Sequence, residues 1–482
     1  MALLGLCNCG GGAGGGGAIP SGRVNVPAGN GPGAPGVAGA PSPSPGAPAS
    51  PAPGAPPGAP PGSSPSASPS ATPAPFVPLH VLTFLYYGQT FAGVQINANL
   101  SASYMAANAD FAETSGYDNA RTNSFKAAGG KYAVTYIDPT FVPYCVPPFT
   151  EPAGACAGQV GKLNPPAGAW FHDSSGARVN RADATTGQYQ EALNPGSAAA
   201  RNAVVATMSQ FTNASPGLDL FFSDDSGSTF IGPNGTVASG MFYGFNASGV
   251  EITTDSQWIS AESALLGAAV RPVILNGGDP STLGPAYNGA FLDLANVRGA
   301  NHEGCFTRGS GAVTDQNQHW QHQADGLLAD LGHHKYSFCM MTGTSSPQTR
   351  LYGLASWWLT YDPQWSVAAP IAPAADGNAV YPEFAIVPRS PRTTASADVN
   401  ALAKGGVYVR EFAQCYQAAV PIGACAAVVN PSASGAAMPA LSIAYTSALT
   451  LDNLSLPAGG SARWSTGVPG TLGPGQAIIL RQ

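Results

Sequence analysis

The run Leu218-Asp-Leu-Phe-Phe-Ser-Asp-Asp225 is a short apolar stretch that stops at two carboxylates. Its aromatic and aliphatic content over so few residues is typical of a buried strand. Similar runs occur before and after it, at residues 81–87, 131–138, 168–172, 271–276, 294–303, 335–341 and 365–369. Between them lie segments of helical character, among them 198–211, 256–269, 317–331 and 349–359. Eight strands that alternate with helices predict an α/β fold with a parallel sheet, a (β/α)₈ TIM barrel.

The pattern changes at both ends of this region. From about residue 396, short strands at 406–412, 425–430, 440–445, 449–452 and 476–480 follow one another without helical segments. They predict a small antiparallel β-sandwich over 396–482, after a barrel over 76–395. Residues 10–75 are almost entirely Gly, Pro, Ala and Ser. Such a segment has too little apolar surface to bury, so we expect a disordered, semi-extended linker.

The first nine residues, Met1-Ala-Leu-Leu-Gly-Leu-Cys-Asn-Cys9, are similar to the end of a bacterial lipoprotein signal that lacks its basic start. On this interpretation Cys9 is the lipidated residue, with Cys7 as the alternative. An ordinary disordered tail is the other interpretation. The first one predicts an exported protein, either a periplasmic or cell-surface lipoprotein or a secreted one.

Charge is scarce in this chain. Only 9% of its residues are charged, and the formal net charge is -7. No Lys/Arg-rich run is present, so we expect no nucleic-acid partner and no contact with a membrane except through a lipid anchor. A neutral polysaccharide or oligosaccharide fits this composition, although an Ala/Gly/Pro-rich sequence would also show low charge without any functional reason. Nucleotide-binding and zinc-ligand motifs are missing too, so we expect no cofactor and no metal.

Six cysteines lie beyond the N-terminal tail, and an even number in an exported chain favours disulfides. Cys145 with Cys156 and Cys415 with Cys425 are pairs close in sequence. Pairing these leaves Cys305 and Cys339 for each other. The last pair requires the end of one predicted strand to lie beside the next strand.

Polar side chains follow several predicted strands, at the end of the barrel where TIM-barrel active sites form. We expect substrate binding by Tyr86, Tyr87, Asp138, Trp170, His172, Asn276 and His302, with the tryptophan ring stacking on a sugar. Asp224, Asp225 and Glu303 are the candidate catalytic residues. Two facing carboxyl groups suffice to hydrolyse a glycosidic bond, one as acid and the other as nucleophile or base. The structural alternative is that Asp225 caps a helix and Glu303 pairs with Arg298 or Arg308.

Several segments, taken in order, resemble a group of TIM-barrel glycosyl hydrolases over roughly residues 78–482. They are Phe222-Ser-Asp-Asp225, Glu303-Gly-Cys-Phe306, Tyr352-Gly-Leu-Ala-Ser356, Gly405-Gly-Val-Tyr-Val-Arg-Glu-Phe412, Val428-Val-Asn-Pro-Ser432 and Ala477-Ile-Ile-Leu480. The carboxylates on strands 4 and 6 are also similar to those of the α-galactosidase-type clan. That likeness implies Asp224 as nucleophile and Glu303 as acid/base. The clan's strand-4 lysine-x-aspartate is absent here, which leaves α-linkage specificity open and Asp225 as an alternative nucleophile.

The leading hypothesis is therefore a retaining glycoside hydrolase that acts on an extracellular polysaccharide. A non-catalytic carbohydrate-binding surface lipoprotein is the first alternative, and a structural surface protein is the second. The placement of the carboxyl groups of Asp224 and Glu303 discriminates between the hydrolase and the binding protein. Groups about 5–5.5 Å apart favour retention, and groups about 6.5–9.5 Å apart favour inversion. Carboxyl groups that point to different regions favour the binding protein.

Overall fold

The computed structural model describes the chain from Leu79 to Gln482, except residues 89, 92–93, 96, 115–118, 145–164, 174, 183–188, 228–251, 253, 278–285, 309–310, 343–345, 371–379, 395–396, 455 and 457–458. The predicted signal with Cys7 and Cys9, the predicted linker over 10–75, and the predicted Cys145–Cys156 bridge lie outside the described residues. Within the described part, no helix is both long and apolar enough to cross a membrane.

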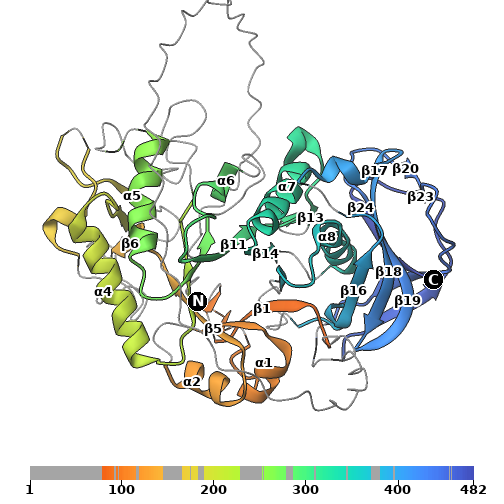
Figure 1. Cartoon of the computed structure of the whole chain (residues 1–482), viewed down its shortest axis with the longest axis horizontal. Coiled ribbons are helices and arrows are strands. Elements are labelled where there is room, and N and C mark those ends of the chain that lie inside the picture. The colour runs from red at the N-terminus through yellow and green to blue at the C-terminus, as the bar shows by residue number, and fades with distance from the viewer. Residues whose placement is uncertain are drawn as a thin grey trace, which may run out of the picture. The chain divides into compact units, whose positions relative to one another are not determined.

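Eight parallel strands form a closed barrel, which confirms the predicted fold class (Figure 1). In chain order they are β1 (Leu82–Tyr86), β4 (Phe111–Thr114), β5 (Tyr132–Ile137), β9 (Leu220–Ser223), β10 (Val273–Asn276), β11 (Val297–Glu303), β14 (Tyr336–Met341) and β15 (Ser366–Pro370). Each pairs with the next along the chain, and β15 closes the barrel against β1. All eight carboxyl ends therefore meet at one mouth.

Helices lie outside the barrel wall, and the predicted helical segments correspond to four of them. The helices are α1 (Ala102–Asn108), α2 (Asn119–Ala127), α4 (Ala198–Ala214), α5 (Asp255–Gly267), α6 (Ala286–Gly289), α7 (His319–Gly332) and α8 (Pro347–Thr360). Ser197, Thr254 and Ser346 each begin a helix by accepting a hydrogen bond from a backbone N–H of its first turn. These caps explain why α4, α5 and α8 begin where the sequence pattern places them.

One predicted barrel strand was wrong and another was missed. Residues 168–172 do not join the barrel, because Ala167–Ala169 form a 3₁₀ helix, η1, and Trp170 and His172 make only isolated bridges. The second barrel strand is instead β4, which pairs with β1 and β5. Because one strand is lost and one gained, Asp224 still follows the fourth strand and Glu303 still ends the sixth.

Side chains of the barrel strands alternate between the interior and the surrounding helices. The interior is filled by a cluster that includes Phe84, Phe111, Phe222, Phe338 and Met340. On β11 this alternation shifts, since the β10–β11 register changes between Val273↔Val297 and Ile274↔Gly299. The extra residue, Arg298, brings every second residue from 299 to 303 to the interior.

A C-terminal antiparallel sheet follows the barrel. Its strands are β16 (Ile386–Pro391), β17 (Ala403–Lys404), β18 (Val407–Gln417), β19 (Val420–Asn430), β21 (Ser447–Leu451), β22 (Ala462–Thr466) and β24 (Gln476–Arg481). Its outer face packs against β20 (Ala436–Ala437) and β23 (Thr471–Leu472), which pair with each other. The remaining short strands are β2 (Thr90–Phe91), β3 (Val94–Gln95), β6 (Phe141–Tyr144), β7 (Asn180–Ala182), β8 (Tyr189–Ala192), β12 (Thr307–Arg308) and β13 (Gly311–Ala312).

Two details of this region differ from the sequence pattern. The sheet begins with β16, before the boundary that we predicted at residue 396. The predicted strand over 440–445 was wrong, because this segment is fixed by side-chain bonds instead of a ladder. Ser442 and Tyr445 both donate to the carboxylate of Glu411.

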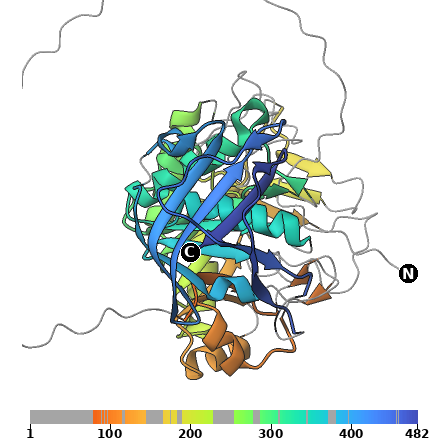
Figure 2. The same ribbon diagram turned by 90° about the vertical axis from the view of Figure 1, so that its right-hand side faces the viewer.

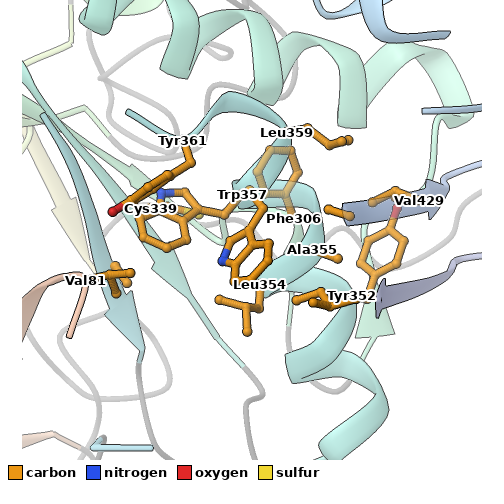
Figure 3. Packing of buried hydrophobic residues seen from close by; sticks show 14 of the residues in the cluster. Val81, Phe306, Cys339, Tyr352, Leu354, Ala355, Trp357, Leu359, Tyr361 and Val429 are labelled. Atoms are coloured by element: carbon orange, nitrogen blue, oxygen red, sulfur yellow. The ribbon is translucent and has the colours of Figure 1, made fainter. Parts of the chain in front are cut away.

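The barrel and the sheet share one hydrophobic core, and α8 lies between them (Figures 1 and 2). Nearly every residue of α8 is buried, including Trp357 and Trp358, as expected for a helix covered on all sides. Figure 3 shows Trp357 among Cys339, Leu354 and Tyr361, with Val429 of the sheet nearby. The sheet therefore completes the packing around α8.

Two buried arginines also join α8 to its surroundings. Arg410 of β18 donates to the carbonyl oxygens of Trp358, Leu359 and Tyr361 at the end of the helix, at 3.3, 3.0 and 2.8 Å. The Trp358 carbonyl also accepts from the N–H of Tyr361, and the guanidinium adds a donor to the carbonyls at this helix terminus. Arg350, nearer the start of α8, forms a fully buried ion pair with Glu383.

Both predicted disulfides in the described part are present. Cys305 and Cys339 have Cα atoms 5.2 Å apart, and Cys415 and Cys425 have Cα atoms 6.0 Å apart. Cys305–Cys339 joins the segment just after β11 to the neighbouring strand β14. The bridge therefore anchors the chain two residues beyond Glu303.

Candidate active site

The barrel mouth brings three predicted site residues into direct contact. Asp224 follows β9, Asn276 ends β10 and Glu303 ends β11, on three adjacent strands. All three continue the interior-facing series of their strands, which passes through Phe222 on β9 and Ile274 on β10. The alternation of strand side chains thus directs them toward the barrel axis.

The amide of Asn276 connects the two carboxyl groups. Its Nδ2 donates to Oδ1 of Asp224 at 2.6 Å and to Oε1 of Glu303 at 2.9 Å. These two oxygens are therefore at most 5.5 Å apart, the sum of the two bonds. This limit matches the separation in retaining glycosidases and is below the range of inverting ones.

Asp224 is almost completely buried and is held by donors from three directions. Besides the Asn276 amide, the hydroxyl of Tyr136 donates to Oδ2 at 2.6 Å, and the backbone N–H of Asp225 donates to Oδ1 at 3.0 Å. Donors of this kind fix the orientation of a carboxylate. Asp225 itself adopts a left-handed backbone, with φ 49°.

Glu303 has a different environment. Its side chain is only partly buried at the mouth, and its one hydrogen bond among the described residues comes from Asn276. Burial and the charge of Asp224 raise the pKa of Glu303 to about 8, against the opposing effect of the Asn276 bond. Arg298 makes no ion pair with it in the described part, and the side chain of Arg308 lies outside what the structure describes. Glu303 therefore carries a proton at neutral pH, while Asp224 is surrounded by donors.

The turn after Glu303 is held in place by several contacts. Gly304 and Phe306 both have left-handed backbones, with φ 63° and 57°. The side chain of Gln323 on α7 accepts from the N–H of Phe306 at 2.7 Å and donates to the carbonyl of Gly304 at 3.3 Å. Together with the Cys305–Cys339 bridge, these bonds fix the backbone that carries Glu303.

Two predicted binding residues face away from the mouth. His302 follows Asn301 and precedes Glu303, so strand alternation turns it outward, where it bonds to Asp330 of α7 at 2.6 Å. Tyr87 also faces the helices, with the guanidinium of Arg121 over its ring at 4.8 Å. The structure does not bring either residue to the carboxyl pair.

The predicted sugar-stacking role of Trp170 was wrong, because its ring is 1% exposed in the core beneath α4 and η1. Trp320 is likewise buried, in the core around α8. His172 is partly exposed and pairs with Arg178 in an isolated bridge outside the barrel. A ring that sugars cannot reach can only stabilise the fold.

Tyr86 and Asp138 also lie near the mouth. The hydroxyl of Tyr86 faces Sδ of Met340 at 3.9 Å in the barrel interior, and the side chain is 9% exposed. Asp138 accepts from the N–H of Thr140 at 2.9 Å, and the hydroxyl of Thr140 donates to the carbonyl of Asp225. Asp138 thus shapes the loop beside Asp224.

Three site residues were missed by sequence reasoning. Tyr136 donates to Asp224, Asn301 donates to Oδ1 of Asn276 at 2.9 Å, and Glu113, the last residue but one of β4, lies on its interior side beside Tyr86 in the register. A signal existed for two of them. Tyr136 and Asn301 lie two residues before Asp138 and Glu303, so the period of a strand places each pair on one face.

No group of three or more His, Cys, Asp or Glu in the described residues has an arrangement that could hold a metal ion. No protein-family model and no curated protein sequence matches the chain.

Solved structures with a similar chain path do exist. They include Aspergillus fumigatus Ega3 in complex with galactosamine (13% identity, TM-score 0.33, covering 58% of this chain and 82% of that one). Another is the glycoside hydrolase domain of PelA from Pseudomonas aeruginosa (10% identity, TM-score 0.36, covering 60% of this chain and 94% of that one). A third is the trehalulose synthase MutB (9% identity, TM-score 0.43, covering 85% of this chain and 100% of that one). At TM-scores of 0.43 or less, these likenesses do not bear on the reaction of this chain.

Proposed function

We propose that the chain is a retaining glycoside hydrolase, with Asp224 as nucleophile and Glu303 as acid/base. The observation that carries the proposal is the Asn276 amide that bonds both carboxyl groups at once. It keeps the groups within the distance at which one can attack an anomeric carbon while the other protonates the leaving oxygen.

The two environments suit two roles. The proton of Glu303 belongs on Oε2, because Oε1 accepts from Asn276. In the first step this proton passes to the glycosidic oxygen, the bond from that oxygen to the anomeric carbon breaks, and Asp224 forms a bond to the carbon. Glu303, now ionised, then removes a proton from water, which displaces Asp224 and regenerates the pair.

The substrate that we infer is an extracellular polysaccharide or oligosaccharide. The two disulfides of the described part are typical of exported proteins. The low charge of the chain favours a neutral polymer over a polyanion. We further propose that export includes lipidation at Cys9, which would place the barrel at the cell surface or in the periplasm.

A hydrolysis assay tests the proposal. The full chain is incubated with a panel of polysaccharides, and new reducing ends are measured for the wild type, Asp224→Asn and Asp225→Asn. Asp293→Asn, the same change at an exposed aspartate, is the control. We expect Asp224→Asn alone to abolish hydrolysis. Binding of a glycan without hydrolysis by the wild type would instead favour the carbohydrate-binding alternative.

A further inference from the structure

The bridge between the carboxyl groups depends on which way the Asn276 amide faces. A primary amide has two N–H donors on nitrogen and acceptor lone pairs on oxygen. With Nδ2 toward the mouth it donates to Asp224 and Glu303. Turned by half a rotation, it would present its oxygen to the same two groups and could not donate to either.

Asn301, in the orientation that it has in the structure, complements the first of these. Its Nδ2 donates to Oδ1 of Asn276 at 2.9 Å, from the register position directly beside it on β11. Asn301 is 1% exposed, so water cannot replace this donor. Its other contact through Nδ2 is a weak one, to Sδ of Met340 at 3.7 Å. A reversed Asn276 amide would place two N–H groups against each other in the barrel interior.

We propose that Asn301 is a positioning residue that keeps both N–H groups of Asn276 directed at the carboxyl pair and acts on the pair only through Asn276. Its relevance to catalysis rests on the proposed function, but its effect on ionisation does not. Without Asn301, Oδ1 of Asn276 loses its buried donor and only the carboxyl pair orients the amide, so its bond to Glu303, which stabilises the charged form, weakens.

The direction of the effect follows from the groups around Glu303. The Asn276 bond lowers the pKa of Glu303, whereas burial and Asp224 raise it. Among the described residues, the other titratable side chains at the mouth are those of Tyr86, Glu113, Tyr136, Asp138 and Asp225, and His302 lies on the outer face of the same strand. The described parts of β10, β14 and β15 contribute no charged side chain at this end. Removing Asn301 should therefore raise the pKa of Glu303, by up to about one pH unit, the value for a charge-assisted bond lost completely.

The experiment is a ¹³C NMR titration of full chain labelled at its glutamate carboxyl carbons. Subtracting the spectra of Glu303→Gln identifies the Glu303 resonance. The variants are Asn301→Leu, which is nearly isosteric, Asn276→Ala, and the double substitution. Thr83→Val is the matched control, because it also removes a buried hydrogen bond from a barrel strand, here to Asn108, away from the pair. Asn301→Ala replaces Asn301→Leu if leucine does not fold.

We expect Asn301→Leu and Asn276→Ala each to raise the Glu303 midpoint, and Thr83→Val to leave it unchanged. In the Asn276→Ala background, Asn301→Leu should add nothing, because its route to the pair is gone. An unchanged midpoint in Asn301→Leu, or an equal shift with and without Asn276, would overturn the proposal. The NMR titration uses no substrate. If it gives the expected shifts while no glycan is hydrolysed, the proposed function is refuted and the role of Asn301 is not.

Discussion

Glu262 on α5 is a carboxyl group buried in the protein interior, and its substitution should change how the free energy of unfolding depends on pH. The side chain is 0% exposed, and neither carboxyl oxygen has a hydrogen-bond partner among the described residues. Burial raises the pKa of Glu262 to about 8, from an ordinary value of 4.5. The group is therefore neutral in the folded protein at pH 7 and ionised in the unfolded chain.

The sign and size of this pH dependence follow from the linkage between protonation and folding. Between pH 4.5 and 8 the folded state keeps a proton that the unfolded state has lost, so stability falls as pH rises. The slope is about 1.4 kcal/mol per pH unit, which amounts to about 3 kcal/mol at pH 7 and about 4 kcal/mol at pH 8, where the folded group is half ionised. Glu262→Gln resembles the protonated acid in shape and cannot ionise. The variant should match the wild type near pH 4 and exceed it by these amounts at higher pH.

Urea unfolding of the full chain at pH 4, 5.5, 7 and 8 measures the difference in free energy of unfolding. Glu191→Gln is the control, because this glutamate pairs with Arg178 near the surface. Curves for Glu262→Gln and wild type that remain parallel from pH 4 to 8 would refute the reasoning. They would mean that Glu262 is ionised in the folded state or is reached by water.

Three further predictions concern the pair and α8. Hydrolysis should fall as pH rises through about 8, because the acid Glu303 loses its proton there. A pH–rate profile of kcat/KM that stays flat to pH 10 would be inconsistent with this role. Glu303→Gln should slow hydrolysis of natural glycans by about 10²- to 10⁴-fold while largely sparing aryl glycosides with good leaving groups; equal losses on both, measured by initial rates, would argue against an acid. Arg410→Met should lower the free energy of unfolding, measured by urea titration, by about 3 kcal/mol, because it leaves buried carbonyls at the end of α8 unpaired. The same substitution at the exposed Arg463 should have little effect.

The barrel was predictable because most of its strands are dense apolar runs. The second strand was not, since Phe111-Ala-Glu-Thr114 has only four residues and two of them favour helices. Residues 168–172 resemble a strand through Trp170 and Phe171, but these rings are buried against α4 rather than in a ladder. Short segments of this kind are decided by tertiary packing, which local composition does not contain.

The candidate site was predictable as a set of strand ends but not as a network. Asp224, Asn276 and Glu303 could be identified because each stops an apolar run. Their connection could not be, because the inward direction of Glu303 depends on the extra residue Arg298 in the β10–β11 register. Without that register, His302 and Glu303 are equivalent candidates, although strand alternation allows only one of them to face the mouth.

The most direct test of the account is covalent trapping of the nucleophile. The full chain is treated with a panel of 2-deoxy-2-fluoroglycosyl fluorides, whose slow second step lets a glycosyl-enzyme accumulate, and the labelled peptide is sequenced by mass spectrometry. We expect a sugar that the enzyme accepts to be attached to Asp224, and the label to be lost in Asp224→Asn but not in Asp225→Asn. Attachment at Asp225, or hydrolysis of a glycan with inverted anomeric configuration and no adduct, would contradict it.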